Sequence, residues 1–319
     1  MANGEHVRPR RIGVFDLGSN TILLLCMAAG GHVIRDQARI TRLGQGVFER
    51  GELAPEAIDR TRQAIEEFAA LARADGVDLL VAVGTEALRR ARGGAQFLAE
   101  LVRDGLVDAA RLLTGDEEAE LTVEATRQSH GAEHAALAVI DVGGGSTEVA
   151  WRERASGPIR GVSLPLGSVR LTEAWLPRHP IPEADLAALR DRVLVASDPL
   201  ARALPSGLPA DAAVVAVAGT ATTLAALEQR LATYDPARVE GFALERVRLV
   251  HWIERLAHLA VSERRLLPGL ESGRADVIVA GLVCLEVALL RLRATRFTVS
   301  ERGVRHGVAL RILAGHKLF

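Results

Sequence analysis

The sequence contains few lysines, cysteines and clustered histidines, and each shortage excludes a class of chemistry. Lys317 is the only lysine of the 319 residues, and no GxxxxGK[ST] string occurs, so phosphoryl transfer of the P-loop type is excluded. Cys26 and Cys284 lie in separate apolar runs outside any CxxC or Cys/His pattern, and we expect both to be buried free thiols. The nine histidines show no HExxH or other zinc-binding spacing.

The chain also lacks a strong net charge and a long uninterrupted apolar run. A formal net charge of -1 gives no general attraction to nucleic acid or to a membrane, so a bound polyanion must be held locally by arginines and backbone groups. No apolar stretch precedes the first predicted strand, so no secretory signal is recognisable and we expect a cytoplasmic protein. Glu286 and Arg291 interrupt the apolar segment ADVIVAGLVCLEVALLRLR, which predicts a buried helix and no membrane span.

Against these absences stand two glycine-rich turns, VFDLGSNT around Asp16 and VIDVGGGSTE around Asp141. Apolar and β-branched residues flank the small residues of each turn, which predicts a strand, a tight turn and a second strand. Such turns let backbone N–H groups approach a phosphate, and an aspartate beside a phosphate requires a cation between the two. The repeat therefore predicts a phosphorylated ligand, bound with Mg²⁺ between two facing lobes.

The segments after each turn also follow similar patterns. The first turn leads into a predicted meander of strands with a reversal at Gly30 and Gly31, followed by a helix that Pro55 opens and Gly76 closes. At Thr85 we predict a change from strand to helix, and the helix runs through EALRRARGGAQFLAELVRDG. The later strings AAVVAVAGTATTLAALEQ and RFTVSERGVRHGVALRILAG each predict a strand, a turn and a helix.

The length of the chain predicts two domains, because single cores stop growing before 319 residues. The stretch SHGAEHAA lacks periodicity, and we place the domain boundary there. The N-terminal domain is then expected at 1–130 and the C-terminal domain at 131–302. A C-terminal helix at about 303–315 can pack back on the N-terminal domain.

Nine strings between residue 12 and about residue 312 resemble, in number and order, the exopolyphosphatase and guanosine pentaphosphate phosphatase family. They are FDLGSNT, TRLGQG, GTEALRRA, TGDEEAEL, IDVGGGSTE, LPLGSVRLTE, AGTATTLAAL, GRADVIVAGL and VSERGVRHG. The resemblance implies the short, two-domain form of that family, which belongs to the actin-like ATPase and sugar-kinase superfamily. It implies an α/β fold of two actin-like, ribonuclease H-like domains with mixed sheets flanked by helices and an active site in the interdomain cleft. It is also compatible with a homodimer.

The two turns contain most of the candidate ligand-binding groups. Asp141 and Glu148 stand on the two arms of one predicted hairpin, and the resemblance assigns them, with Asp16, to Mg²⁺ directly or through waters. The alternatives are a plain hairpin turn and, for Glu148, a solvated strand carboxylate. The predicted phosphate-binding residues are Gly18, Ser19, Asn20, Thr21, Arg42, Arg89, Gly143, Gly144, Gly145, Ser146 and Thr147.

A pair of glutamates, Glu117 and Glu118, begins another predicted helix. Thr114 and Glu117 fit a capping box, which explains Glu117 without a catalytic role. Glu118 points to a different face, and the family's GxEEA-like motif places its catalytic carboxylate at the second glutamate. Glu118 is therefore the predicted base for an attacking water, with Glu117 as the less favoured candidate. Because a helix N-terminus depresses a carboxylate pKa, we expect Glu118 mainly to orient the water.

Four arginines, Arg42, Arg89, Arg170 and Arg305, fall inside the family-like strings, whereas most other arginines decorate amphipathic helices. Arg89 follows a Gly-Thr turn and matches the arginine of the family's ATxALR string, so it is the main candidate for a phosphate clamp. The usual alternative for a single arginine is a solvated surface position.

The favoured function is Mg²⁺-dependent hydrolytic release of terminal orthophosphate from inorganic polyphosphate. Guanosine pentaphosphate is the alternative substrate, because nothing in the glycine turns distinguishes a phosphate chain from a nucleotide. Gly219, Thr220 and Thr222 occupy the position where actin-like ATPases contact adenosine, but no aromatic or acidic ribose partner accompanies them in the sequence. The further alternatives are an actin-like-fold kinase and a non-catalytic nucleotide or polyphosphate sensor.

Overall fold

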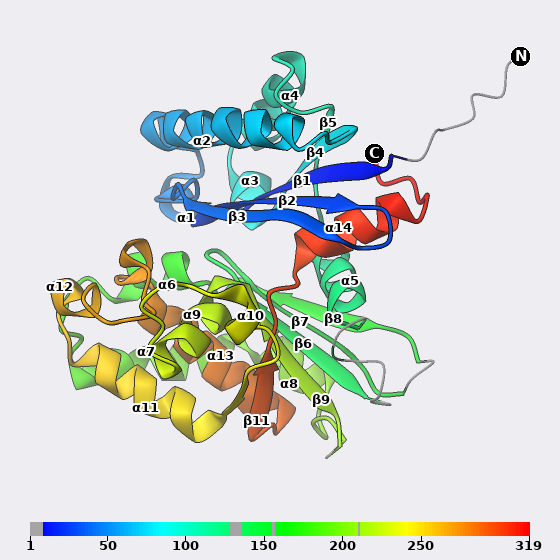
Figure 1. The fold of residues 1–319 in the computed structure, drawn as a ribbon. Helices are drawn as coiled ribbons and strands as arrows, with labels where there is room; N and C mark the ends of the chain where they lie inside the picture. Colours follow the sequence, from blue (N-terminus) through cyan, green and yellow to red (C-terminus); the bar gives the residue numbers. More distant parts are fainter. Residues whose placement is uncertain (1–8, 128–129, 131–135, 155–156, 210) are drawn as a thin grey trace, which may run out of the picture.

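The structure is a computed structural model that describes residues 9–127, 130, 136–154, 157–209 and 211–319. It consists of two lobes, each built on one β-sheet (Figure 1). The strands are β1 (Arg11–Leu17), β2 (Thr21–Ala28), β3 (Val33–Ile40), β4 (Leu79–Gly84), β5 (Ala109–Leu112), β6 (Leu137–Val142), β7 (Thr147–Arg152), β8 (Arg160–Leu164), β9 (Ala213–Val217), β10 (Ala243–Glu245) and β11 (Arg296–Val299). The helices are α1 (Val47–Arg50), α2 (Pro55–Ala74), α3 (Glu86–Arg90), α4 (Gly94–Arg103), α5 (Gly115–Thr126), α6 (Ser168–Trp175), α7 (Glu183–Ala196), α8 (Asp198–Ala203), α9 (Ala218–Glu228), α10 (Pro236–Val239), α11 (Arg246–Ala257), α12 (Val261–Arg264), the 3-10 helix η2 (Ser272–Arg274), α13 (Ile278–Leu292) and α14 (Val304–Leu313).

The sheet of the N-terminal lobe has the strand order β3-β2-β1-β4-β5. β1, β2 and β3 form an antiparallel meander, while β4 and β5 run parallel to β1. Gly30 and Gly31 make the predicted reversal, both at φ +85°, a conformation that glycine adopts without steric cost. The helix α2 packs its apolar face on one side of the sheet, with Ile65 and Phe68 in the core.

The sheet of the C-terminal lobe repeats this order. Its strands follow β10-β11-β9-β6-β7-β8, in which β6, β7 and β8 are the meander and β9 and β11 run parallel to β6. Five strands of each lobe therefore correspond, with β6 in the place of β1 and β7 in the place of β2. The two mixed sheets with flanking helices confirm the predicted α/β fold class.

The last helix of each repeat packs on the sheet of the other lobe. α5, which follows β5, packs through Ala119 and Val123 on β6, β7 and β8. α14, which follows β11, packs through Val308 and Ile312 on β1 and β2. The two helices cross between the lobes (Figure 1), and Gly307 allows the close approach, because a Cβ there would lie 2.2 Å from the Leu121 carbonyl oxygen.

α14 lies within the predicted range 303–315, and the segment 131–135 beside the predicted domain boundary lies outside the described residues. The predicted helix after Thr85 is wrong in one respect, since it is divided into α3 and α4. Gly93, at φ +83°, separates the two helices.

Other predictions of local structure are confirmed. Cys26 and Cys284 are buried free thiols, and α13 is a buried helix. The capping box at the start of α5 is present, because the Glu117 amide donates to the Thr114 hydroxyl at 3.2 Å and the Thr114 amide donates to the Glu117 carboxylate at 2.8 Å. In the part of the chain that the structure describes, no helix combines the length and the apolar character that crossing a bilayer requires.

Candidate active site

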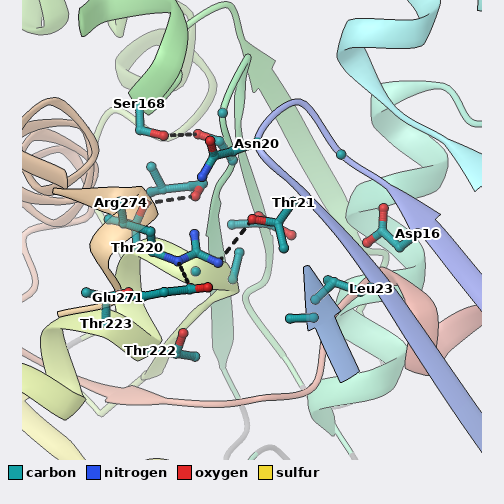
Figure 2. A pocket seen from close by; sticks show the side chains of 18 of the residues that line it. Asp16, Asn20, Thr21, Leu23, Ser168, Thr220, Thr222, Thr223, Glu271 and Arg274 are labelled. Carbon is teal, nitrogen blue, oxygen red and sulfur yellow. Dashed lines mark hydrogen bonds and ion pairs between the residues drawn. The ribbon is translucent and has the colours of Figure 1, made fainter. Parts of the chain in front are cut away.

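A cavity of about 610 Å³ lies between the lobes, at the ends of the corresponding strands β1 and β6. Both glycine-rich turns line it, as does the start of α5. Figure 2 shows Asp16 on one side of this cavity and Thr220, Thr222 and Thr223 on the other. The predicted site residues that line it are Asp16, Gly18, Ser19, Asn20, Thr21, Glu118, Asp141, Gly143, Gly144, Gly145, Ser146 and Glu148.

The two turns have the same hydrogen-bonded geometry. The Gly18 amide donates to the Thr21 carbonyl at 3.2 Å, and the Gly143 amide donates to the Ser146 carbonyl at 3.0 Å. Within the described parts of the chain, the amides of the two residues that follow each of these glycines donate to no protein group. Both ends of the Asn20 side-chain amide are likewise buried without a partner. Buried donors without partners require a ligand or water, and an anion satisfies several at once.

The carbonyl groups of the turns are held by neighbouring segments. The Ser19 carbonyl accepts from the Gly44 amide at 2.7 Å, and the Gly144 carbonyl accepts from the Val169 amide in α6 at 2.9 Å. The turns also touch each other, because a Cβ on Gly144 would lie 2.8 Å from the Cβ of Ser19. With their carbonyls occupied, the turns present mainly N–H groups to the ligand.

Three of the predicted acidic residues gather beside the turns. Burial raises the pKa of Asp16 to about 6, and Arg305 opposes the shift. Burial, with repulsion from Glu148 and Asp16, raises the pKa of Asp141 to about 8. Burial also raises the pKa of Glu148, although its carboxylate accepts a hydrogen bond from the Ser163 hydroxyl at 2.7 Å.

The acidic residues fit a hard cation, because they offer only oxygen ligands and because a cation relieves their mutual repulsion. Among the residues that the structure describes, no three His, Cys, Asp or Glu side chains lie close enough to hold a metal directly. Carboxylate oxygens are the ligands that Mg²⁺ takes in proteins, usually together with several of its waters.

Of the two glutamates that begin α5, only Glu118 lines the cavity. Its side chain is 7% exposed, and the Arg89 guanidinium donates to its carboxylate. Burial and the nearby Glu148 raise the pKa of Glu118 well above its ordinary value, while Arg89 opposes the shift. The predicted depression of this pKa by the helix N-terminus is therefore wrong, because burial outweighs the helix dipole. Glu117 instead caps the helix and pairs with Arg111.

Three of the predicted phosphate-binding residues, Arg42, Arg89 and Thr147, do not line this cavity. Arg42 forms a two-bond ion pair with Asp276 of the C-terminal lobe, at 2.8 and 2.9 Å, because the loop after β3 faces that lobe. Arg89 is engaged by Glu118 and by Glu86. The Thr147 hydroxyl donates to the Leu166 carbonyl at 2.6 Å and thus supports the turn from behind.

Arg305 and Arg274 are the arginines that do line the cavity. Arg305, near the start of α14, is 6% exposed and holds Asp36 with two hydrogen bonds of 2.8 and 3.0 Å. Arg274 donates to the Thr21 hydroxyl at 3.1 Å (Figure 2). Sequence reasoning missed Arg274, and only its place in the GRADVIVAGL string could have indicated it.

The part of the cavity beside Thr220 and Thr222 also contains groups that were not foreseen. Tyr234 and Glu271 line the same cavity as the threonines, so an aromatic and an acidic residue that are distant in sequence accompany them in the fold. Tyr234 lies twelve residues beyond Thr222 and Glu271 lies after α12, so proximity in sequence gave no signal for either.

Comparisons with known proteins agree with the geometry. The model of the Ppx/GppA phosphatase family matches residues 26–316. The chain is similar to Exopolyphosphatase 2 of Mycobacterium tuberculosis, with 34% identity over 94% of this chain and 98% of the relative. It is also similar to the crystal structure of an exopolyphosphatase-like protein, with a TM-score of 0.87, 28% identity and coverage of 94% and 98% of the two chains. An Aquifex aeolicus member of the Ppx/GppA family matches with a TM-score of 0.77 and 29% identity, over 97% of this chain and all of the other.

Proposed function

The chain belongs to the Ppx/GppA phosphatase family, and from this membership we propose that it is an exopolyphosphatase that releases terminal orthophosphate from inorganic polyphosphate by hydrolysis. The observation that supports this proposal most strongly is the pair of turns, whose unpartnered amides face one cavity together with Glu118. Hydrolysis of a phosphoanhydride bond needs charge stabilisation, a positioned water and a base, and each requirement has a candidate group here.

The turns bind the phosphate groups in this proposal. The amides of Ser19, Asn20, Gly144 and Gly145 donate to phosphate oxygens, and the fixed carbonyl contacts behind them keep these donors in place. We propose that Asp16, Asp141 and Glu148 hold Mg²⁺ through oxygen ligands and waters. The bound ion would neutralise the phosphate charge that these carboxylates otherwise repel.

Glu118 accepts the proton of the attacking water. Its raised pKa makes Glu118 a stronger base than an ordinary carboxylate. The ion pair with Arg89 favours the charged carboxylate, which is the form that can accept a proton. Because this carboxylate is buried yet lines the cavity, it can reach a water beside a bound phosphate.

Guanosine pentaphosphate is the second candidate substrate. The observation that favours it is that Thr222, Thr223, Tyr234 and Arg274 line the same cavity as the turns. Here an aromatic ring, hydroxyls and a guanidinium surround enough space for a group larger than phosphate.

The test measures orthophosphate release from long-chain polyphosphate and from guanosine pentaphosphate in parallel, with Mg²⁺ or with a chelator. We expect Mg²⁺-dependent release from polyphosphate, and a loss of about a hundredfold to ten-thousandfold in kcat for Glu118→Gln. Glu117→Gln is the matched control, because its carboxylate lies outside the cavity, and it should retain most of the activity.

Each of the other results would change the proposed substrate, the proposed base or the proposed class of protein. Release from the nucleotide alone would make guanosine pentaphosphate the substrate. Full activity of Glu118→Gln would contradict its role as the base. No release from either substrate would favour the kinase or the sensor.

A further inference from the structure

Glu86, the first residue of α3, separates the cavity from three arginines. Its carboxylate accepts a hydrogen bond from Arg89 Nη2 at 3.0 Å. It also lies 3.9 Å from Arg90 Nε and 3.9 Å from Arg170 Nη1. Glu86 lines the cavity, whereas none of these three arginines appears among the described residues that line it. Glu86 is therefore a cavity-lining carboxylate that all three guanidinium groups approach.

Arg90 and Arg170 share one carboxylate partner in the part of the chain that the structure describes. Glu118 contacts Arg89, but Glu86 is the carboxylate that Arg90 and Arg170 approach in the described structure. Arg170 Nη1 is buried without a hydrogen-bond partner. Burial, with repulsion from Arg90, lowers the pKa of Arg170, and Glu86 opposes the shift.

Glu86, which these arginines approach, adjoins both glycine-rich turns. The Glu86 Cγ lies 3.1 Å from the position that a Cβ on Gly145 would take, and the Ser19 Oγ lies 3.0 Å from the same position. Arg170 belongs to α6 of the C-terminal lobe and rests over the Phe48 ring at 5.1 Å, which fixes its guanidinium. An anion that replaced the carboxylate would thus contact guanidinium groups of both lobes beside the turn amides.

We propose that Arg89, Arg90 and Arg170 form a binding site for a phosphate group, and that the Glu86 carboxylate occupies this site in competition with phosphate. The inference rests on the proposed function, because that function places a phosphate chain in the same cavity. Guanidinium groups match phosphate oxygens through paired hydrogen bonds, so phosphate forms better contacts here than a single carboxylate does. Phosphate can bind this site only in the molecules whose Glu86 carboxylate has turned away from the arginines. The apparent affinity for phosphate is therefore the intrinsic affinity multiplied by the fraction of such molecules.

The experiment measures orthophosphate binding by calorimetry on the full chain with Mg²⁺, independently of turnover. Glu86→Gln removes the competing charge and should lower the orthophosphate Kd by about fivefold. Arg170→Ala removes part of the site and should raise this Kd by about fivefold or more. Glu52→Gln is the matched control, because Glu52 forms an ion pair of 3.0 Å with Arg92 in the same lobe but does not line the cavity. It should leave the Kd unchanged.

A second variant, Glu86→Asp, keeps the inference testable if Glu86→Gln does not fold. Glu86→Asp keeps the charge but withdraws it from Arg170, so it should also lower the Kd, and thermal unfolding will verify that each variant is folded. An unchanged or higher Kd in folded Glu86→Gln or Glu86→Asp would overturn the inference, as would a wild type that does not bind orthophosphate. Failure of the proposed function is a separate result, namely a wild type that releases no phosphate from polyphosphate.

Discussion

The two glycine-rich turns occupy equivalent places in the two lobes, yet only one of them has a second carboxylate. In the N-terminal lobe Asp16 pairs across the hairpin with Leu23, whereas in the C-terminal lobe Asp141 pairs with Glu148. The pKa of Asp16 is raised to about 6 and that of Asp141 to about 8, and repulsion from Glu148 appears among the causes only for Asp141. The carboxylate at this one position of the repeat thus contributes to the electrostatic difference between the lobes, beside the burial that raises both pKa values.

Helices α5 and α14, each of which packs on the sheet of the other lobe, also differ in the charged residue that they bring to the cavity. α5 brings Glu118 to the cavity, and α14 brings Arg305 to it, although the two helices follow corresponding strands. The lobes therefore share their backbone, which provides N–H groups for phosphate, but differ in the charged side chains that act on it. We infer that the backbone shared by the two lobes binds phosphate, and that the charged side chains in which the lobes differ catalyse the hydrolysis.

The largest effect is expected where Glu148 and Leu23 are changed to the same residue. Glu148→Gln removes a carboxylate from the proposed Mg²⁺ site and should lower kcat/KM for polyphosphate by about a hundredfold to a thousandfold. Leu23→Gln places the same side chain at the equivalent position of the other lobe, where no charge is lost, and should change kcat/KM by less than about threefold. Steady-state phosphate release with Mg²⁺ measures both. Equal losses in the two variants would mean that the asymmetry has no functional role.

The features of this site that the sequence predicted depend on local signals. Glycine and aspartate between apolar runs specify the turns, and the Thr114–Glu117 pair specifies the start of α5. These patterns span fewer than about ten residues, so the chain predicts them without knowledge of the tertiary fold.

The features that the sequence did not predict depend on contacts between distant segments. Arg42 forms an ion pair with Asp276, which is 234 positions away. The short string around Arg42 contains no sign of this partner, so the sequence predicted a phosphate contact for Arg42. Glu86 and Arg274 look in sequence like ordinary helix-surface charges, because periodicity cannot say that a cavity adjoins them. The packing of α5 on the other lobe's sheet also has no local signal, and it explains why Glu118 is buried enough for its pKa to rise.

The pH dependence of stability should distinguish the two aspartates. Both pKa values are raised from 3.8 in the folded state, so the folded state binds the proton more tightly and stability falls as pH rises toward the folded pKa. This fall is complete near pH 6 for Asp16 but continues to about pH 8 for Asp141. In the presence of a chelator, Asp141→Asn should reduce the fall in stability between pH 6 and 8 by on the order of 1 kcal/mol per pH unit. Asp16→Asn should reduce this fall less, because it removes only the repulsion that Asp16 exerts on Asp141.

Denaturant unfolding at pH 6 and pH 8 measures this difference. Glu118 and Glu148 also have raised pKa values, so they add their own pH dependence to the measured stability. Both glutamates are present in both variants, so this contribution is shared by the two. A larger effect of Asp16→Asn than of Asp141→Asn between these pH values would show that the second carboxylate does not set the difference between the lobes.

The smallest effect concerns two similar ion pairs, one between the lobes and one within a lobe. Arg42–Asp276 joins the lobes, while Arg35–Asp75 joins β3 to the end of α2, and each has two hydrogen bonds between partly exposed groups. Replacing either arginine by alanine should lower the free energy of unfolding by less than about 1 kcal/mol. Only Arg42→Ala should also lower kcat/KM, by about threefold, because it loosens the closed arrangement of the turns. Equal kcat/KM for the two variants would mean that the interlobe pair contributes stability alone.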